Sequence, residues 1–278
     1  MTISRARILT FTAVAAVIYV ALTIVFADGL WSLGNLWSSE YIFEGTWFTY
    51  ALLAAIIVLG LVQAQQLGDR ELAVHPNPDA EVDGQVEDPK LWKLLLGNTW
   101  LAVLWLPLRF FVGQEWLVAG EHKVRDSAWM ETGEALQGFL TRAVTVPEGR
   151  PTAPAGAYGW YQDFLQYMID HEWYTWFAKI VAVGEVLVGL GLIFGGLVGI
   201  AAFFGTVMNV SFMLAGTASS NPVLFGLSVF IILGWKVAGH LGIDRWLLPM
   251  LGTPWQPGPR REQPRDERTI VGGRHYPA

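Results

Sequence analysis

The 278-residue sequence contains no cysteine. This absence excludes disulfides, thiol nucleophiles, cysteine-ligated iron–sulfur clusters and covalently attached c-type haem. Any redox cofactor must then be bound without thiolates or belong to a partner protein. Charged residues are also scarce, at 15% of the chain, and the net charge of −6 provides no basic surface for nucleic acid.

Apolar residues make up 53% of the chain, and tryptophan occurs 14 times. The stretch from Phe177 to Leu241 has only four ionisable side chains in about 65 residues, at positions 179, 185, 236 and 240. Breaks at Gly195-Gly196 and at Ser219–Pro222 divide it into pieces of about 20 residues, the length that spans a bilayer. Because lipid cannot satisfy backbone polar groups, each piece is predicted to be a helix.

The sequence predicts an all-α, polytopic membrane helical bundle. Its six predicted spans are Ile8–Phe26, Trp47–Leu67, Leu94–Leu117, Phe177–Phe194, Leu197–Ala215 and Val223–Leu241. The first span has an alternative interpretation as a signal peptide, because two arginines precede it and Val25-Phe26-Ala27 resembles a cleavage site.

The spans divide the chain into three parts. Residues 1–93 hold two N-terminal spans and a polar loop, residues 94–248 hold four spans, and residues 249–278 form a tail predicted to be disordered. Basic residues cluster near the N-terminus, around 70–93 and in the tail, so the positive-inside rule places both termini in the cytoplasm. The predicted location is the plasma membrane of a prokaryote.

The long segment 120–176 then faces outward. Asp126-Ser127 is expected to cap a helix over Ala128–Ala143, and the aromatic-rich stretch Trp160–Trp176 is expected to lie as a helix in the membrane interface. Between them, Val146–Gly159 is rich in proline and glycine and is expected to be irregular.

Ionisable residues within spans are functional-site candidates because burying a charge in lipid is costly. Arg109 and Glu185 are each predicted about 12 Å below the outer ends of their spans, so a buried ion pair between them is geometrically possible. Asn209 is predicted at nearly the same depth, with Glu115 nearer the surface. One interpretation is an ion pair that only fixes helix register.

The other interpretation is the polar floor of a pocket for a quinone head group or a small anion. The aromatic side chains of Trp105, Trp116 and Phe212 would form its walls, with His122 and Lys123 at its mouth. Arg109, Glu185 and Glu115 would be the catalytic residues, and Arg109 would donate to two oxygens at once.

Histidine positions argue against bound haem. A b-type haem would need two axial histidines at one depth, whereas His122 and His240 are predicted at opposite membrane edges, about 30 Å apart. No histidine spacing typical of a metal site is present either, so no metal site is predicted.

Short motifs between about residues 98 and 248 resemble the DoxX/DoxD family of membrane proteins. They are the stretch Arg109–Lys123 with Asp126 and Trp129, Ala178–Gly189, Met208–Gly216, Asn221-Pro222, and Trp235–Gly239 with Asp244-Arg245-Trp246. The resemblance implies a four-helix membrane domain to which this chain adds two N-terminal spans. An arginine frequent in the family's middle turn is missing from Phe194–Val198.

The resemblance implies a DoxD-like subunit of thiosulfate:quinone oxidoreductase, an enzyme in which a DoxA-type subunit is the partner. Two hypotheses follow, with a transporter as a third. In the first, this chain is a catalytic membrane subunit that oxidises thiosulfate or a related anion and reduces quinone. In the second, it is a non-catalytic anchor or assembly subunit of a respiratory or oxidative-stress complex, alongside a second protein subunit.

Overall fold

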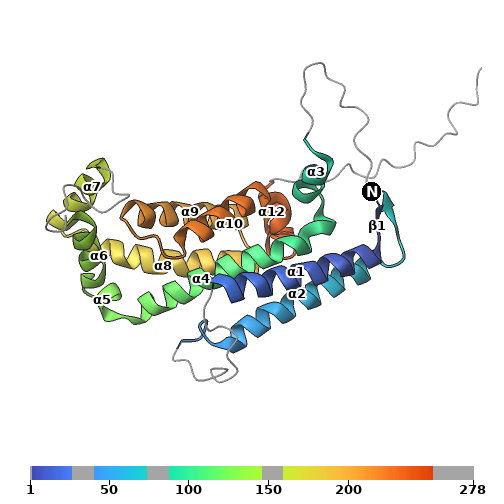
Figure 1. Ribbon diagram of the computed structural model, residues 1–278, viewed down its shortest axis with the longest axis horizontal. Helices are drawn as coiled ribbons and strands as arrows, with labels where there is room; N and C mark the ends of the chain where they lie inside the picture. Colours follow the sequence, from blue (N-terminus) through green and yellow to red (C-terminus); the bar gives the residue numbers. More distant parts are fainter. Residues whose placement is uncertain (1, 27–40, 74–87, 146–158, 253–278) are drawn as a thin grey trace, which may run out of the picture.

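A computed structural model describes residues 2–26, 41–73, 88–145 and 159–252. Within these ranges the chain is helical apart from one short strand pair, and its long helices run side by side along an elongated molecule (Figure 1). The all-α prediction is therefore confirmed. Most of the predicted irregular segment 146–159, and all of the predicted tail after residue 252, lie outside the described residues.

The N-terminal part is a helical hairpin. Helices α1 (Arg5–Phe26) and α2 (Thr46–Leu67) are antiparallel, and the strands β1 (Thr2–Ile3) and β2 (Leu72–Ala73) pair at their open end. The two helices approach closely because Gly60 has no side chain where the Thr12 side chain lies. Small residues at such crossings are typical of helix pairs in membranes.

The third predicted span contains a change of helix type. Helix α3 (Lys90–Gly97) stops at Asn98, whose side chain caps the 3₁₀ helix η2 (Thr99–Trp105) by accepting from the Trp100 N–H. Helix α4 (Leu106–Arg125) then begins with Pro107 in its first turn, where a missing N–H costs nothing. It continues eight residues beyond the predicted end of the span.

Helix α8 (Tyr174–Phe194) packs along α4, and α9 (Val198–Leu214) and α10 (Asn221–Leu233) complete the second helical group. The predicted turn between α8 and α9 is confirmed at Gly195, whose φ of +68° suits glycine. After Gly234, the short helix α11 (Trp235–Ala238) and helix α12 (Asp244–Met250) end the described chain. Pro249 and Met250, predicted as part of the tail, belong to α12.

Three short helices cap one end of the bundle: α5 (Ser127–Met130), α6 (Glu134–Val144) and α7 (Gly159–Asp170). The predicted cap is confirmed, since Asp126 accepts a hydrogen bond from the Ala128 N–H. The single expected helix over 128–143 is split, because Gly133 has a φ of +78°. The expected helix over 160–176 ends at Asp170 and restarts at Tyr174, with Glu172 at a φ of 55°.

Burial in this molecule follows the pattern of a membrane protein. Helices α1, α2 and α8, together with the continuous η2–α4 segment Thr99–Arg125, are long and apolar enough to cross a bilayer. Their outer faces expose residues such as Val17, Val58 and Leu187, whereas Arg109, Glu185 and Gln114 are buried inside. Apolar side chains outside and polar ones inside fit a lipid environment. The protein is therefore a membrane protein whose helices contact the lipid bilayer.

The prediction of six similar spans is met only in part. Helix α9 has 17 residues and α10 has 13, so both are shorter than the four long helices. The last predicted span, 223–241, is interrupted at Gly234, where the Trp105 ring occupies the space that a side chain would need. His240 consequently lies in the turn between α11 and α12, outside any long helix.

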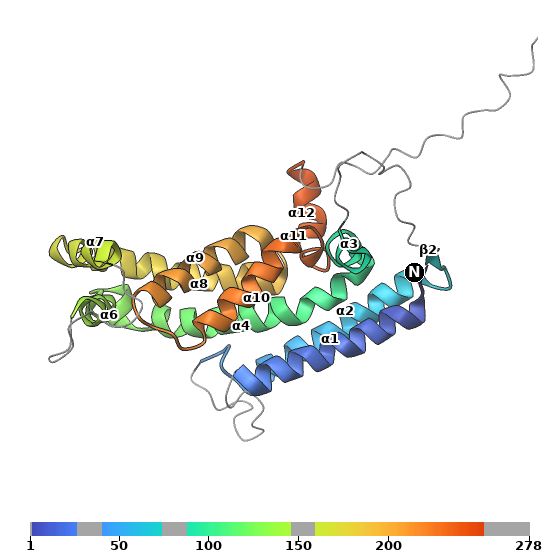
Figure 2. The ribbon, with the colours of Figure 1, turned by 45° about the horizontal axis from the view of Figure 1, so that its top comes forward.

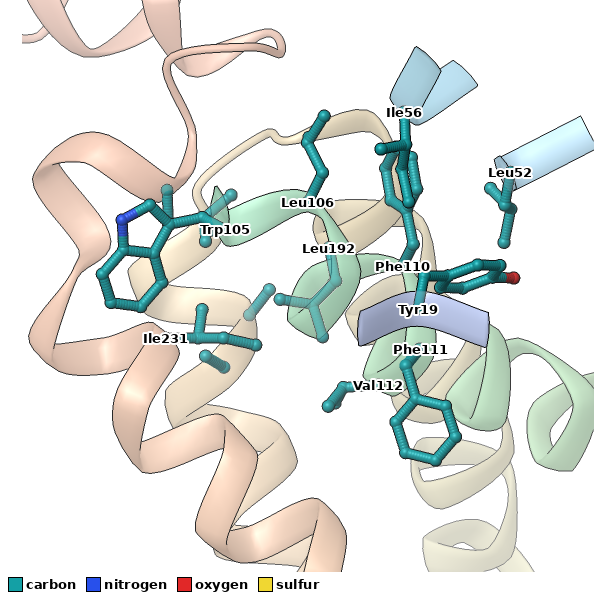
Figure 3. Packing of buried hydrophobic residues seen from close by; sticks show 14 of the residues in the cluster. Tyr19, Leu52, Ile56, Trp105, Leu106, Phe110, Phe111, Val112, Leu192 and Ile231 are labelled. Carbon is teal, nitrogen blue, oxygen red and sulfur yellow. The ribbon is translucent and has the colours of Figure 1, made fainter. Parts of the chain in front are cut away.

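The core lies where α4 meets the other helices. Figure 3 shows Leu52 and Ile56 of α2 pointing towards Tyr19 and Phe110, while Trp105 and Ile231 lie on the α10 side. One polar chain crosses this core: the Tyr19 hydroxyl donates to Gln114, and the Gln114 amide donates to Thr49, each at 2.8 Å. These bonds join α1 and α2 to α4.

The bundle has two distinct ends. Helices α5, α6 and α7 gather at one, the α7 end, while β1, α3 and α12 gather at the other, the α12 end (Figures 1 and 2). The first and last described residues thus lie at the same end. That placement agrees with the predicted alternation of spans, and the cytoplasmic assignment of this end stays a prediction.

Candidate functional site

A pocket of about 360 Å³ opens near the α7 end of the bundle, between α4, α8, α9 and the start of α10. Five of the nine predicted site residues line it. They are Glu115, Trp116 and Lys123 of α4, Glu185 of α8 and Phe212 of α9. The pocket therefore has aromatic side chains and charged side chains in its lining.

An ion pair lies in the wall of the pocket. Lys123 Nζ is 2.6 Å from Glu185 Oε2, and the Glu185 side chain is only 1% exposed. Lys123 extends from the last turn of α4 back along the helix, where Nζ also lies 3.5 Å from the Ala119 carbonyl oxygen and 5.1 Å from the centre of the Trp129 ring. The ammonium group therefore lies inside the bundle, where it neutralises the buried Glu185 carboxylate.

Glu115 provides a second carboxylate. It is half-buried in the pocket wall, on the same helix as Lys123. Within the described part of the chain, no hydrogen bond or ion pair to its side chain is found. A carboxylate in such a position can take up or release a proton, or bind a donor group of a ligand.

Aromatic rings form the apolar walls. Trp116 and Phe212 have ring centres 6.5 Å apart, and Phe139 of α6 contacts Phe212 edge to face at 6.0 Å. Trp129 of α5 lines the pocket beside Lys123. The helices that cap the α7 end therefore contribute to the site.

Hydroxyl and amide groups complete the lining at the α9–α10 connection. Thr217, Ser219, Ser220 and Asn221 all border the pocket. The sequence marked Ser219–Asn221 as a helix break and Asn221 as part of a family-like motif, but it assigned none of these residues, nor Trp129 or Phe139, to a site. Their proximity to Glu185 depends on how α5, α6 and α10 fold back, which no local pattern specifies.

Asn209 lies next to this pocket without lining it. Its side chain is fully buried on the inner face of α9, and among the described residues neither its Oδ1 nor its Nδ2 has a hydrogen-bond partner. Asn209 is one turn from Gly205 and from Phe212, both of which approach Trp116. The residue is thus buried beside Trp116, at the inner side of the pocket.

The predicted Arg109–Glu185 pair was wrong. Gly120 of α4 packs against Glu185 and Val186, and Gly113 packs against Leu192 and Ile193. Arg109 is a further turn along α4 and about 16 Å from the level of Glu185 at 1.5 Å per residue. The error came from the depth estimate, because α4 extends beyond the predicted end of its span.

Arg109 serves the α12 end instead. It is fully buried, and its guanidinium donates to the carbonyl oxygens of Leu192 at 2.9 Å, Ala238 at 2.7 Å and Ile193 at 3.1 Å. These carbonyls belong to the final turns of α8 and α11, which have no partner within their own helices. Arg109 therefore joins the ends of two helices, far from the pocket.

Asp244 has the complementary role at the same end. Its carboxylate accepts hydrogen bonds from the Leu197 N–H at 2.5 Å and the Val198 N–H at 2.9 Å, at the beginning of α9. Burial raises the pKa of Asp244, while these two N–H groups and the Arg109 charge act against that rise. Asp244 was not identified from the sequence as a capping residue, because α9 and α12 are 46 residues apart.

Two further predicted site residues also lie elsewhere. Trp105 belongs to η2 near the α12 end, where its Nε1 donates to the Leu95 carbonyl oxygen at 3.1 Å. His122 turns away from the pocket: its ring stacks on Tyr41 at 3.7 Å, and its Nε2 lies 3.2 Å from Glu44. Neither residue lines the pocket, so the prediction that they would line it was wrong.

No group of three or more histidine, aspartate or glutamate side chains able to hold a metal ion occurs in the described ranges. The comparisons of the chain with protein families, curated proteins and solved structures find no match. The class of the protein is therefore set by its own features. It is a helical membrane protein with a charged, aromatic-walled pocket near one end of its bundle.

Proposed function

We propose that this protein binds a quinone head group in the pocket at the α7 end and serves as the membrane subunit of a quinone-linked redox system. The observation that carries the proposal is the Lys123–Glu185 pair, set in a pocket of about 360 Å³ walled by Trp116, Phe139 and Phe212. Ligand pockets typically combine apolar walls with a few well-placed polar groups.

Both parts of a quinone, the head group and the isoprenoid tail, fit the chemistry of this region. Its ring is flat and apolar and can stack on the aromatic side chains, while its carbonyl oxygens accept hydrogen bonds. Lys123 supplies a charged donor for one carbonyl. The exposed apolar faces of α8 and α9 beside the pocket suit the isoprenoid tail, which would remain in lipid.

Reduction of a quinone to a quinol takes up two electrons and two protons. We assign Glu115 as one proton donor and the Lys123 ammonium group, which is paired with Glu185, as the other, because both border the pocket. The resemblance to the DoxX/DoxD family suggests thiosulfate as the electron donor, acting directly or through a second subunit. Arg109 has no catalytic role in this proposal, because its donors are turned to helix ends.

The proposal is tested by filling the pocket. Ala119 lines it with a small side chain, so Ala119→Phe should exclude the ligand. His122→Phe is the matched control, because it adds a ring on the same helix at a position turned towards Tyr41. Affinity for a short-chain ubiquinone analogue would be measured by tryptophan fluorescence in detergent.

Wild type and His122→Phe should bind the analogue with similar affinity, and Ala119→Phe should bind it at least about tenfold more weakly, a loss of about 1.4 kcal/mol. Equal affinity of all three proteins would show that the pocket is not the quinone site. Absence of binding to the wild type would reject quinone as the ligand.

A non-catalytic anchor subunit is the second candidate. The observation that favours it is that Arg109 and Asp244 join helix ends. The fully buried Arg109 cation therefore has a structural role. Thiosulfate-dependent quinone reduction by the purified chain alone would contradict this candidate. Activity that appears only in native membranes would support it.

A further inference from the structure

Among the described residues, five side chains have a buried polar atom without a hydrogen-bond partner, and three of them belong to α4, α9 and α10. They are Trp116 Nε1 of α4, both amide atoms of Asn209 of α9, and Ser228 Oγ of α10. Trp116 is 3% exposed, and Asn209 and Ser228 are fully buried. A buried polar group without a partner destabilises the folded protein, so native proteins seldom keep one without a compensating ligand or ordered water.

The first two groups are neighbours. A Cβ atom placed on Gly205 would lie 3.0 Å from Trp116 Nε1, so the indole N–H lies against α9 at Gly205. Asn209 follows Gly205 by one helical turn and therefore lies on the same face of α9. Phe212, a further turn along that face, has its ring 6.5 Å from the Trp116 ring. Asn209 is thus flanked on both sides by contacts with Trp116.

The third group lies close to the same level. Helices α9 and α10 are antiparallel neighbours, and Gly199 of α9 packs against Trp235, the first residue of α11, two residues after α10 ends. Ser228 lies seven residues before Trp235, on α10, so it lies close to the level of the α9 residues just after Gly205. It shares the buried face of α10 with Leu224, which lines the pocket.

We infer that Trp116, Asn209 and Ser228 form an inner subsite of the pocket that binds an acceptor oxygen of the ligand. In terms of the function proposed above, on which this inference rests, that atom is the quinone carbonyl oxygen opposite the one held by Lys123. The Trp116 indole N–H and the Asn209 Nδ2 donate to it. When the ligand is bound, the Ser228 hydroxyl donates a hydrogen bond either to Asn209 Oδ1 or to a substituent of the quinone ring.

Trp116 lies deeper along α4 than the Lys123 ammonium group. Lys123 Nζ reaches back to the level of Ala119, and Trp116 lies three residues deeper, about 4.5 Å along the helix. Trp116 lines the pocket with its ring and presents its nitrogen to α9. A flat ring between the two positions would have one carbonyl towards Lys123 and the other towards the inner subsite.

The inference predicts opposite effects of one substitution on stability and on binding. Asn209→Leu replaces a buried amide by an apolar side chain of similar size. Without quinone, the variant should melt at a higher temperature than the wild type, because two unpaired polar atoms are removed. With the short-chain ubiquinone analogue, the wild type should be stabilised further, whereas Asn209→Leu should bind about tenfold more weakly.

Infrared spectroscopy of the bound analogue, labelled with carbon-13 at one carbonyl at a time, identifies which oxygen is involved. In the wild type both carbonyl stretches should lie below those of the free quinone. In Trp116→Phe and Asn209→Leu only one of them should return to the free value. Ser211→Ala is the control, since the Ser211 hydroxyl donates to Val207 within α9.

The outcomes separate the two proposals. If the wild type binds the analogue and both variants bind it equally well with unchanged carbonyl stretches, the inner subsite is wrong and the pocket assignment stands. If Asn209→Leu melts below the wild type without quinone, a resident water occupies the site, and the inference is overturned. If the wild type binds no quinone, both proposals fail. If Asn209→Leu fails to fold, the affinity and the carbonyl stretches of Trp116→Phe provide the test of the inner subsite.

Discussion

Lys123 Nζ and Glu185 Oε2 lie 2.6 Å apart, and they join the last turn of α4 to the middle of α8. The two partners differ in exposure: the lysine side chain is 19% exposed and the glutamate side chain 1%. The lysine thus enters the pair from the open end of the pocket. This pair, and not the predicted Arg109–Glu185 pair, is the charged centre of the candidate site.

Removal of the lysine charge should destabilise the protein. Lys123→Met leaves Glu185 buried without its cation, which should cost about 3 kcal/mol of unfolding free energy. The double variant Lys123→Met/Glu185→Gln should recover most of that loss, because no charge then remains buried. Unfolding in detergent, followed by circular dichroism, measures both values.

Lys179→Met is the control for this pair, since Lys179 is on the exposed side of α8. It should leave the unfolding free energy within about 0.5 kcal/mol of wild type. If Lys123→Met unfolds like the wild type, the ion pair contributes nothing to stability, and the assignment of Glu185 as a paired carboxylate is wrong.

Arg109 should behave as a structural residue. Arg109→Met leaves three carbonyl oxygens of α8 and α11 without donors, and we expect a loss of about 3 kcal/mol or more. Arg109→Lys should restore little, because an ammonium group lacks the planar fork that reaches several acceptors at once. The yield of monodisperse protein and its unfolding free energy provide the measurement. A well-folded Arg109→Met protein that has lost only ligand binding would show that Arg109 is a binding residue and would contradict its structural role.

The contact between Trp105 and Gly234 makes a separate prediction. A Cβ atom at Gly234 would overlap the Trp105 ring, so Gly234→Ala should destabilise the protein by about 1–3 kcal/mol. Gly226→Ala, on the same helix with no neighbouring atom within 4 Å, should be neutral or stabilising. Thermal unfolding of the two variants tests the contact. Equal melting temperatures would mean that Trp105 does not pack there.

His240 should make stability depend on pH. Burial, together with the Arg245 charge, lowers the pKa of His240 below its usual 6.5. The unfolded chain therefore binds a proton at a higher pH than the folded chain, so stability is complete above about pH 6.5 and falls as the pH is lowered through that value. His240→Gln should remove this loss. The comparison is the change in melting temperature between pH 7.5 and pH 5.5 for both proteins, and identical changes would contradict it.

The helices themselves were largely predictable from the sequence. Apolar runs of about 20 residues specify the long helices, because lipid requires internal hydrogen bonding. The close contact at the break of the last predicted span was not predictable, because its partner Trp105 is 129 residues before Gly234 in the chain. The extension of α4 to Arg125 was missed because its last turns contain charged residues, which resemble an exit into water.

The candidate site was predicted in composition better than in geometry. Glu115 and Glu185 were identified because charges are rare within apolar spans, whereas Trp116, Phe212 and Lys123 were named as the walls and the mouth of a pocket around them. Which charges pair depends on helix register, and an error of eight residues in the end of α4 assigned Arg109 to the wrong partner. Trp129 and Phe139 reach the pocket because α5 and α6 fold back against the bundle. The periodicity of the sequence does not predict this packing.

The most direct test of the central claim is to map where a quinone binds. A photoreactive azidoquinone would be irradiated with the purified protein in detergent, and labelled peptides identified by mass spectrometry, with and without excess short-chain ubiquinone. The account predicts competed labelling of peptides that contain Trp116, Phe139 or Phe212. Competed labelling confined to the α12 end, or labelling that excess ubiquinone does not reduce, would contradict it.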